Sequence, residues 1–164
     1  MLPAVHKEAP KETILHPLRG GMNVMQKKAI RNWIGSVEDG MKEAVEKNPD
    51  NEVVMPPQHH VWGGMFVREL FMPAGAVIVS KIHKVDHLTF VLEGEAEVID
   101  EFGSAEVYTA PSLIKTPAGM KRILRIKTDS RWMTVHLNPD GIEDADEFEK
   151  HIISPTHLDL LEGE

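Results

Sequence analysis

The chain has 164 residues, of which 41% are hydrophobic and 27% charged, which is enough for one globular domain with a sizeable core. Its net charge of −8 argues against binding to nucleic acid or to anionic membranes, because both depend on Lys and Arg. The chain contains no cysteine, so disulfides and thiolate metal sites are excluded. No segment has the pattern of a signal peptide or a membrane-spanning helix, and a cytoplasmic protein is expected.

The first part of the chain predicts an extended arm followed by a helix. Residues 1–22 contain three prolines and two glycines, which favour an extended arm. In residues 23–48, hydrophobic side chains recur every four positions, as in an amphipathic helix. Asn23 can cap its start, and the Asn48-Pro49 step can end it. We expect this helix to pack on the sheet of its own domain, although a partner or dimer interface would use the same face.

The middle of the chain predicts short β-strands separated by turns. After a proline-rich loop at 49–61, the strands fill residues 61–138, and the turn signals are Pro73-Ala74-Gly75, Glu93-Gly94, Gly103-Ser104 and Pro117-Ala118-Gly119. Many short strands with such spacing are typical of a sandwich or a barrel. Residues 139–164 predict a short acidic helix and a tail. The expected fold is therefore mainly β: an antiparallel jelly-roll barrel with an N-terminal amphipathic helix and a short C-terminal helix.

Two histidines four residues apart, His83 and His87, are the first candidates for chemistry. Strict alternation places His83 on the same side of its strand as Val77 and Val79. Residues 84–86 can turn the chain, so that the two histidines face each other across a hairpin. Two neutral imidazoles about 4 Å apart at their tips suit a Zn, Fe, Mn or Ni ion. The alternative is a pair of polar residues at a barrel mouth without a metal.

A third metal ligand can come from the last strand. Trp132, Thr134 and His136 share one face of the segment RWMTVHLNP, and if that face points inward, His136 completes a three-histidine set. The alternative for His136 is a surface or hydrogen-bonded position at the strand end. His59 and His60 are further candidates, although their proline-rich loop favours exposure.

The predicted barrel resembles the cupin superfamily. The first motif of that superfamily, G-x5-H-x-H-x3-E-x6-G, matches here at Gly75, His83 and Gly94. Lys81 stands at the position of the first histidine, and His87 stands at the position of the glutamate. The glycine framework of the motif is therefore retained, while its ligand set is largely replaced.

The second cupin motif, G-x5-P-x-G-x2-H-x3-N, matches at Pro117 and Gly119. Arg122 takes its histidine position and Ile126 its asparagine position. The resemblance implies a cupin-like barrel, a divalent transition metal (Fe, Mn, Zn or Ni), and a homodimer that pairs through sheet edges and terminal arms. The runs IHKVDHL, PAGMKR and WMTVHLNP are also similar to small cupin-like proteins of tailed bacteriophages and prophages, which would make the protein virion-associated.

The two basic residues at histidine positions suggest an anion site. The guanidinium of Arg122 can hold the carboxylate or phosphate of a small substrate through two parallel hydrogen bonds, and Lys81 can do so as a point charge. The alternative is a salt bridge with Glu93, Glu95 or Glu97.

Two functions remain open at this stage. The first is a metal-dependent enzyme that acts on a small anionic molecule, with His83, His87 and His136 as ligands. The second is a non-catalytic structural or assembly module that acts through its helix and N-terminal arm. The retained His83 and the placement of His87 favour the first, whereas the loss of the usual cupin ligands favours the second.

Overall fold

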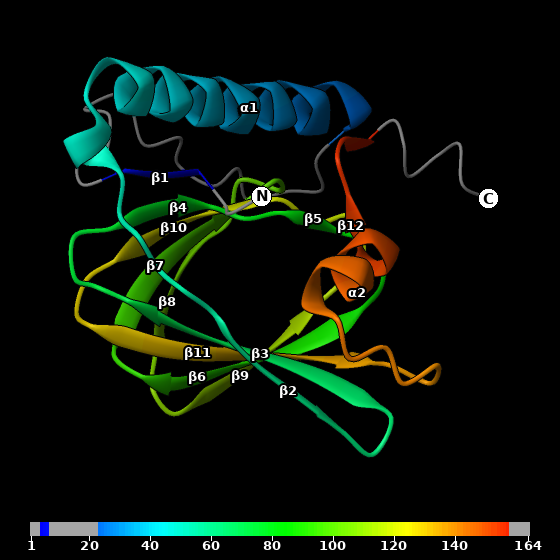
Figure 1. Cartoon of the computed structure of the whole chain (residues 1–164). Helices are drawn as coiled ribbons and strands as arrows, with labels where there is room; N and C mark the ends of the chain where they lie inside the picture. The colour runs from blue at the N-terminus through cyan, green and yellow to red at the C-terminus, as the bar shows by residue number, and fades with distance from the viewer. Residues whose placement is uncertain (1–3, 7–22, 158–164) are drawn as a thin grey trace.

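Two five-stranded antiparallel sheets face each other and enclose the core (Figure 1). The computed structural model describes residues 4–6 and 23–157. In spatial order, sheet A contains β1 (Ala4–His6), β4 (Val77–Val79), β10 (Arg122–Ile126), β7 (Glu95–Asp100) and β8 (Ala105–Thr109). Sheet B contains β2 (Gln58–Trp62), β3 (Met65–Met72), β11 (Ser130–Leu137), β6 (His87–Glu93) and β9 (Ser112–Thr116). This is the antiparallel jelly-roll barrel expected from the sequence.

The helix α1 (Val24–Lys47) lies across the outer face of sheet A (Figure 1). It begins with a capping box, in which the Asn23 side chain accepts from the Gln26 N–H and the Gln26 side chain accepts from the Asn23 N–H, each at 2.9 Å. Ile34 and Met41 are buried against the sheet residues Val77, Val79, Ile99 and Ile123. The apolar face of the helix therefore covers its own domain, as expected.

A second helix, α2 (Ala145–Ile152), packs near the end of the barrel where the short strands β5 (Ile82–His83) and β12 (Ile153–Ser154) pair (Figure 1). Asp144 caps its start by accepting from the Glu147 N–H at 2.8 Å. Phe148 stacks on Phe66 of β3, with ring centroids 4.1 Å apart. This contact fixes α2 beside the barrel interior.

Glycines hold the strand ends in register at positions that other residues do not tolerate. Gly94, between β6 and β7, has a φ of +83°, and a Cβ there would lie 2.3 Å from both the carbonyl oxygen of Asp129 and the Oγ of Ser130. Gly75 and Gly119 close the two Pro-Ala-Gly turns with φ of 84° and 77°. These turns position β4, β6 and β10, which carry or flank the cavity residues described below.

The structure differs from the sequence-based expectation at 49–61. The last part of this segment is not a loop but the strand β2, which pairs with β3 in antiparallel register, and a short 3₁₀ helix (Pro49–Asn51) precedes it. The sequence did not predict this strand, because prolines precede Gln58 and the segment QHHVW is only weakly apolar.

The expected N-terminal arm lies outside the described residues, except for β1, which pairs with β4 of the same chain. The end of the predicted C-terminal tail, 158–164, also lies outside them. Neither described helix combines the length and the apolar character needed to cross a membrane.

Candidate metal and anion site

Three histidines from separate strands meet inside the barrel. His83 lies on β5, His87 on β6 and His136 on β11, and one ring nitrogen of each lies within 4.8 Å of the others. The ring centroids are 4.1, 4.6 and 4.9 Å apart. His87 and His136 are buried and His83 is half-buried. The structure thus brings together the three histidines selected from the sequence.

His83 reaches the interior by a different route from the predicted hairpin. Its strand β5 pairs with β12 and not with β6. Val77 and Val79 pack against α1, so strict alternation would have left His83 on the outer face of the barrel. The strand is interrupted at Ser80 and Lys81, and both residues line the interior cavity. This interruption shifts the alternation by one residue and turns His83 inward.

All three imidazoles are neutral at pH 7. Burial lowers the pKa of His83 to about 2, that of His136 to about 3 and that of His87 to about 4. Repulsion from neighbouring imidazoles and arginines lowers the pKa of His83 and His136 further, whereas at His87 the hydrogen bond to Val85 partly opposes the effect of burial. Because a metal ion binds the neutral imidazole, the cluster need not release protons at this pH in order to bind one.

One unsatisfied ring nitrogen, on His87, and one close nitrogen pair, between His83 and His136, provide the positions that a metal ion would use. His87 Nδ1 donates to the Val85 carbonyl at 3.3 Å, which leaves its Nε2 with the free lone pair. His87 Nε2 and His136 Nδ1 are buried without a hydrogen-bond partner among the described residues. His83 Nδ1 and His136 Nε2 lie 2.9 Å apart. Two adjacent ligands on one ion have a similar spacing when the metal–nitrogen bonds are about 2.1 Å. The donor set therefore fits a divalent transition metal.

A cavity of about 120 Å³ adjoins this cluster and is lined by His83 and His87. Apolar side chains of both sheets, including Met72, Ile78 and Trp132, form much of its wall, and no Asp or Glu belongs to the part of the wall formed by described residues. The indole Nε1 of Trp132 is buried without an acceptor in the described structure. A ligand that supplies hydrogen-bond acceptors would therefore bind more tightly in this cavity.

Arg122 carries a buried charge beside the cavity that forms no ion pair with a described residue, although the carboxylate of Asp100 on the neighbouring strand attracts it. Its side chain is only 7% exposed, and its Nε has no acceptor among the residues described. Burial lowers its pKa, but a guanidinium stays charged at neutral pH. The alternative salt bridges to three nearby strand carboxylates do not form, because Glu93, Glu95 and Glu97 pair with Arg131, Lys127 and Arg125 respectively.

Lys81, the second candidate anion ligand, is paired with an acid that the sequence did not identify. It contacts Glu149 of α2, and Glu149 also accepts from Arg68 Nη2 at 3.0 Å. Lys81 and Arg68 both line the cavity. Ser80 and Lys81 also line an outer cleft of about 850 Å³, to which Glu149 belongs. The ion pair therefore lies between the cavity and the outer cleft.

The remaining candidate histidines lie apart from the cluster. His59, on β2, accepts a hydrogen bond from Arg68 Nε at 3.2 Å and packs against Phe66. His60 is exposed and lies 3.8 Å from Glu69. His59 thus helps to position a cavity arginine, whereas His60 has no contact with the site.

Comparison with known proteins supports the fold. No protein-family model matches the chain, and no curated protein matches its sequence. The structure is similar to that of ectoine synthase from P. lautus, with a TM-score of 0.50 and 16% identity over 63% of this chain and 76% of that one. A putative ethanolamine utilization protein Q from Salmonella typhimurium gives a TM-score of 0.46 and 20% identity over 53% of this chain and 72% of that one.

A cupin-2 domain containing protein from Shewanella frigidimarina gives a TM-score of 0.44 and 12% identity over 56% of this chain and 89% of that one. At such identities the likeness concerns the fold alone. The fold and the histidine cluster together define a cupin-like antiparallel β-barrel with a candidate three-histidine metal site.

Proposed function

We propose that the protein binds a divalent transition metal through His83, His87 and His136 and takes a small anionic molecule beside it. The observation that carries the proposal is the convergence of three neutral imidazoles, two of them buried with a ring nitrogen that has no partner in the described structure. Iron, manganese, zinc and nickel all accept such nitrogen ligands. Three protein ligands leave further coordination positions for water or substrate.

Arg122 supplies the binding charge for the anionic molecule. Its guanidinium is buried and forms no ion pair with a described carboxylate, since Asp100 attracts it only without direct contact, so the carboxylate or phosphate of a ligand would be its first full partner. Trp132 offers a second unpartnered donor on the same cavity wall. The cavity of about 120 Å³ takes a ligand of roughly six non-hydrogen atoms, because a benzene-sized molecule occupies about 150 Å³.

The apolar part of the wall strengthens these polar contacts. Met72, Ile78 and Leu124 keep water from that side of the cavity and leave the ligand's polar end to Arg122 and the histidine cluster. A metal bound to the cluster would polarise a ligand oxygen or activate water or dioxygen. Isomerase, lyase and dioxygenase chemistry are all compatible with such a site.

A non-catalytic binding module is the second candidate. It is favoured by the lack of Asp and Glu in the described cavity wall, because no carboxylate is then placed there as a general base. The version of this idea in which the helix and arm contact a partner is less favoured. The apolar face of α1 is already used by sheet A, and β1 pairs within the chain.

Metal analysis of protein purified without an affinity tag tests the proposal. We expect close to one iron, manganese, zinc or nickel ion per chain, and its loss in His83→Ala, His87→Ala and His136→Ala. His60→Ala is the matched control, because His60 is exposed and lies outside the cluster. A wild-type protein that takes up none of the four metals after incubation with each would overturn the proposal, as would full occupancy in the cluster variants.

Titration calorimetry of the metal-loaded protein with acetate, oxalate and inorganic phosphate tests the anion site. We expect at least one of these anions to bind to wild type and to lose at least about tenfold in affinity in Arg122→Leu, which is about 1.4 kcal/mol. Turnover of a bound acid or consumption of dioxygen would identify the enzyme, and binding without either would identify the second candidate. Equal affinity of the variant and wild type for the anion would show that Arg122 does not bind it.

A further inference from the structure

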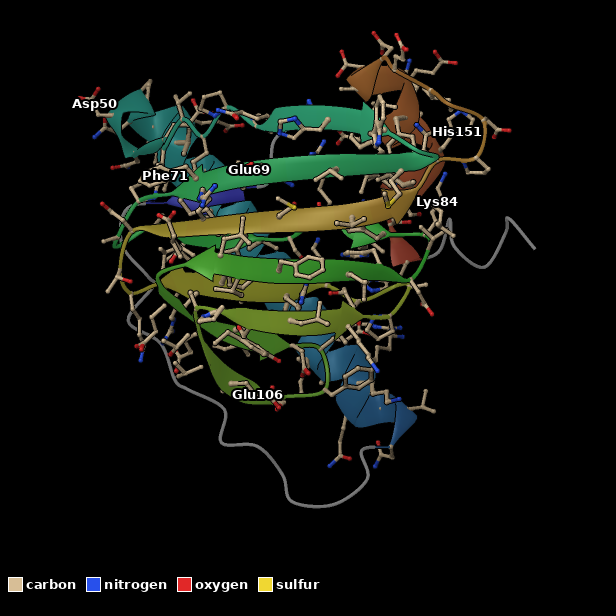
Figure 2. The ribbon with its side chains drawn as sticks, turned by 90° about the horizontal axis from the view of Figure 1, so that it is seen from below. Asp50, Glu69, Phe71, Lys84, Glu106 and His151 are labelled. Carbon is tan, nitrogen blue, oxygen red and sulfur yellow. The ribbon has the colours of Figure 1, made fainter. Side chains whose placement is uncertain are left out.

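The outer face of sheet B carries many exposed hydrophobic side chains beside a group of paired charges, and nothing in the described structure covers it. Strand alternation places six exposed hydrophobic side chains on this face: Trp62, Met65, Phe71, Leu88, Leu113 and Leu137. They are half of the twelve large hydrophobic side chains that are exposed in the described residues. Figure 2 shows the face with Glu69 and Phe71 labelled. Trp62, Met65 and Leu137 are neighbours across β2, β3 and β11, and exposed hydrophobic side chains gathered on one face of a folded domain mark an interaction surface.

We propose that this face binds the same face of a second copy of the chain. A comparison of the outer faces of the two sheets gives the physical reason for this pairing. The outer face of sheet A is also apolar, and α1 covers it with Ile34 and Met41. No helix of the described residues lies on the outer side of sheet B (Figure 1). A second sheet packed about 10 Å away is the standard way to bury such a surface.

The described structure meets the rest of the chain at sheet A and not at this face. The two parts join at β1, at the start of α1 and after His157. β1 and α1 both lie at sheet A. His157 contacts Glu101, which in turn binds Arg31 of α1. All three junctions are therefore on the opposite side of the barrel from the exposed face.

The charges on this face suit a copy of itself better than a lipid surface. Arg131 pairs with Glu69 at 2.9 Å and with Glu93 at 2.8 Å, and Lys115 stands on the edge strand β9. A twofold axis parallel to the central strand β11 would bring the β9 edge of one copy over the β2–β3 edge of the other. The lysine of one copy would then approach Glu69 of its partner. Anionic lipid would instead meet acidic side chains and a chain of net charge −8.

The face is also large enough for a stable dimer. Five strands with the usual spacing span roughly 24 Å by 20 Å, and side chains standing on that area enlarge its accessible surface. A standard interface buries on the order of 800 Å² on each partner. Trp62, which is 83% exposed, and Leu137, which is 82% exposed, provide large side chains that only an interface would bury.

Sedimentation velocity over about 1 to 100 µM tests the interface, because dimer formation depends on concentration. We expect wild type at twice the chain mass, 2 × 18.4 = 36.8 kDa, and Leu137→Lys and Trp62→Lys at 18.4 kDa. Met25→Lys is the matched control: its side chain is 76% exposed, but it lies on α1 at the other sheet, so this variant should remain dimeric. Circular dichroism establishes that each variant is folded.

Tryptophan emission gives a second readout of the same surface. Trp62 should move to an apolar environment on dimerisation, so that the emission of wild type shifts to longer wavelength on dilution and that of Leu137→Lys does not change. A wild type that stays monomeric at the highest concentration would overturn the proposal. Dimers that persist in both variants would also overturn it. A monomer that co-sediments with vesicles of phosphatidylcholine and phosphatidylglycerol would assign the face to lipid.

Discussion

Two groups of buried charge in this protein are built in opposite ways. Between α1 and sheet A, the Glu101 carboxylate accepts two hydrogen bonds from Arg31, at 2.6 and 3.0 Å, and lies 3.2 Å from His157 Nε2. In the barrel, Arg122 lies beside the cavity with no described carboxylate as partner, and the histidine cluster leaves two ring nitrogens unpaired within the described structure. The first group is satisfied internally, and the second is not.

The difference between these groups separates a structural role from a binding role. A buried polar group without a partner costs about 1–3 kcal/mol, so a domain with several of them is less stable than its packing allows. The Glu101 network avoids this cost because each charge has a partner. The barrel site does not avoid it, and a metal with an anionic ligand would supply the missing interactions. The following changes should separate the two groups, beginning with the largest expected effect.

The histidine cluster should make the metal-free protein less stable as the pH falls from 7 to 5. Unfolded histidine takes up protons near its usual pKa of about 6.5. The folded cluster does not, because its pKa values are about 2, 3 and 4. The unfolded state therefore binds more protons in this range, and the free energy of unfolding falls by roughly 2 kcal/mol for each histidine, roughly 6 kcal/mol in all. Urea unfolding of chelator-treated protein at the two pH values measures this.

The Glu101 network should not contribute to that fall. Burial raises the pKa of Glu101, but the hydrogen bonds from His157 and Arg31 outweigh it and keep the pKa below its usual value. Its stabilising effect is then complete at pH 5 and is lost only below the ordinary range of a glutamate. We expect His87→Asn to reduce the loss between pH 7 and 5 by about a third, and Glu101→Gln to leave it unchanged. An unchanged loss in His87→Asn would contradict the assignment of neutral histidines.

Arg31→Met should destabilise the protein by about 2 kcal/mol at pH 7. It leaves the buried Glu101 carboxylate with His157 alone, and removal of one partner of a fully buried pair costs about 3–5 kcal/mol. The expected loss is smaller because Arg31 itself is 39% exposed. Urea midpoints measure the effect, with Lys47→Met in the exposed pair with Glu43 as a control that should not move. Equal midpoints for all three proteins would mean that the network does not stabilise the fold.

The sequence was sufficient for the fold class because local signals mark the strand ends. Gly94 shows why: its position admits no Cβ, so the glycine on which the cupin motif aligns is required by the backbone itself. The hydrophobic period of α1 predicted its packing in part: Met41 on the predicted stripe and Ile34 beside it are buried, whereas Met25 at the start of that stripe is exposed. The strand β2 was not predicted because apolar and polar residues alternate only weakly in QHHVW. Pairing with β3, and not hydrophobicity, determines the structure of this segment.

The site was only partly predictable. The three histidines could be selected from spacing and strand faces, but the argument for His83 relied on a hairpin that does not form. Its inward direction depends on the break at Ser80 and Lys81, which leaves no composition signal. The pairing of Lys81 with Glu149 joins distant parts of the chain, and Glu149 sits in a helix whose acids resembled a solvated surface. Contacts between residues far apart in the sequence determine which basic side chain remains without an ion pair. Such contacts can be found only in the three-dimensional structure.

Arg122→Leu should have the smallest effect on stability, and its sign should be opposite to that of Arg31→Met. The substitution removes a buried charge that has no ion pair and only the nearby Asp100 to attract it, and an apolar side chain of lesser volume suits the neighbouring Leu124 and Met72. We expect the free energy of unfolding to rise by about 1 kcal/mol or to stay unchanged, because replacing a poorly compensated buried charge by a hydrophobic group is commonly neutral or stabilising.

Arg68→Leu is the matched control for Arg122→Leu, because Arg68 lines the same cavity but is paired with Glu149, and its loss should destabilise the protein. Urea unfolding of the three proteins without ligand distinguishes the cases. If Arg122→Leu were destabilised as much as Arg68→Leu, the guanidinium of Arg122 would have to be stabilised by the fold itself. The contrast between a satisfied structural network and an unsatisfied binding site would then fail at its central residue, since a charge held by the fold has no need of a ligand.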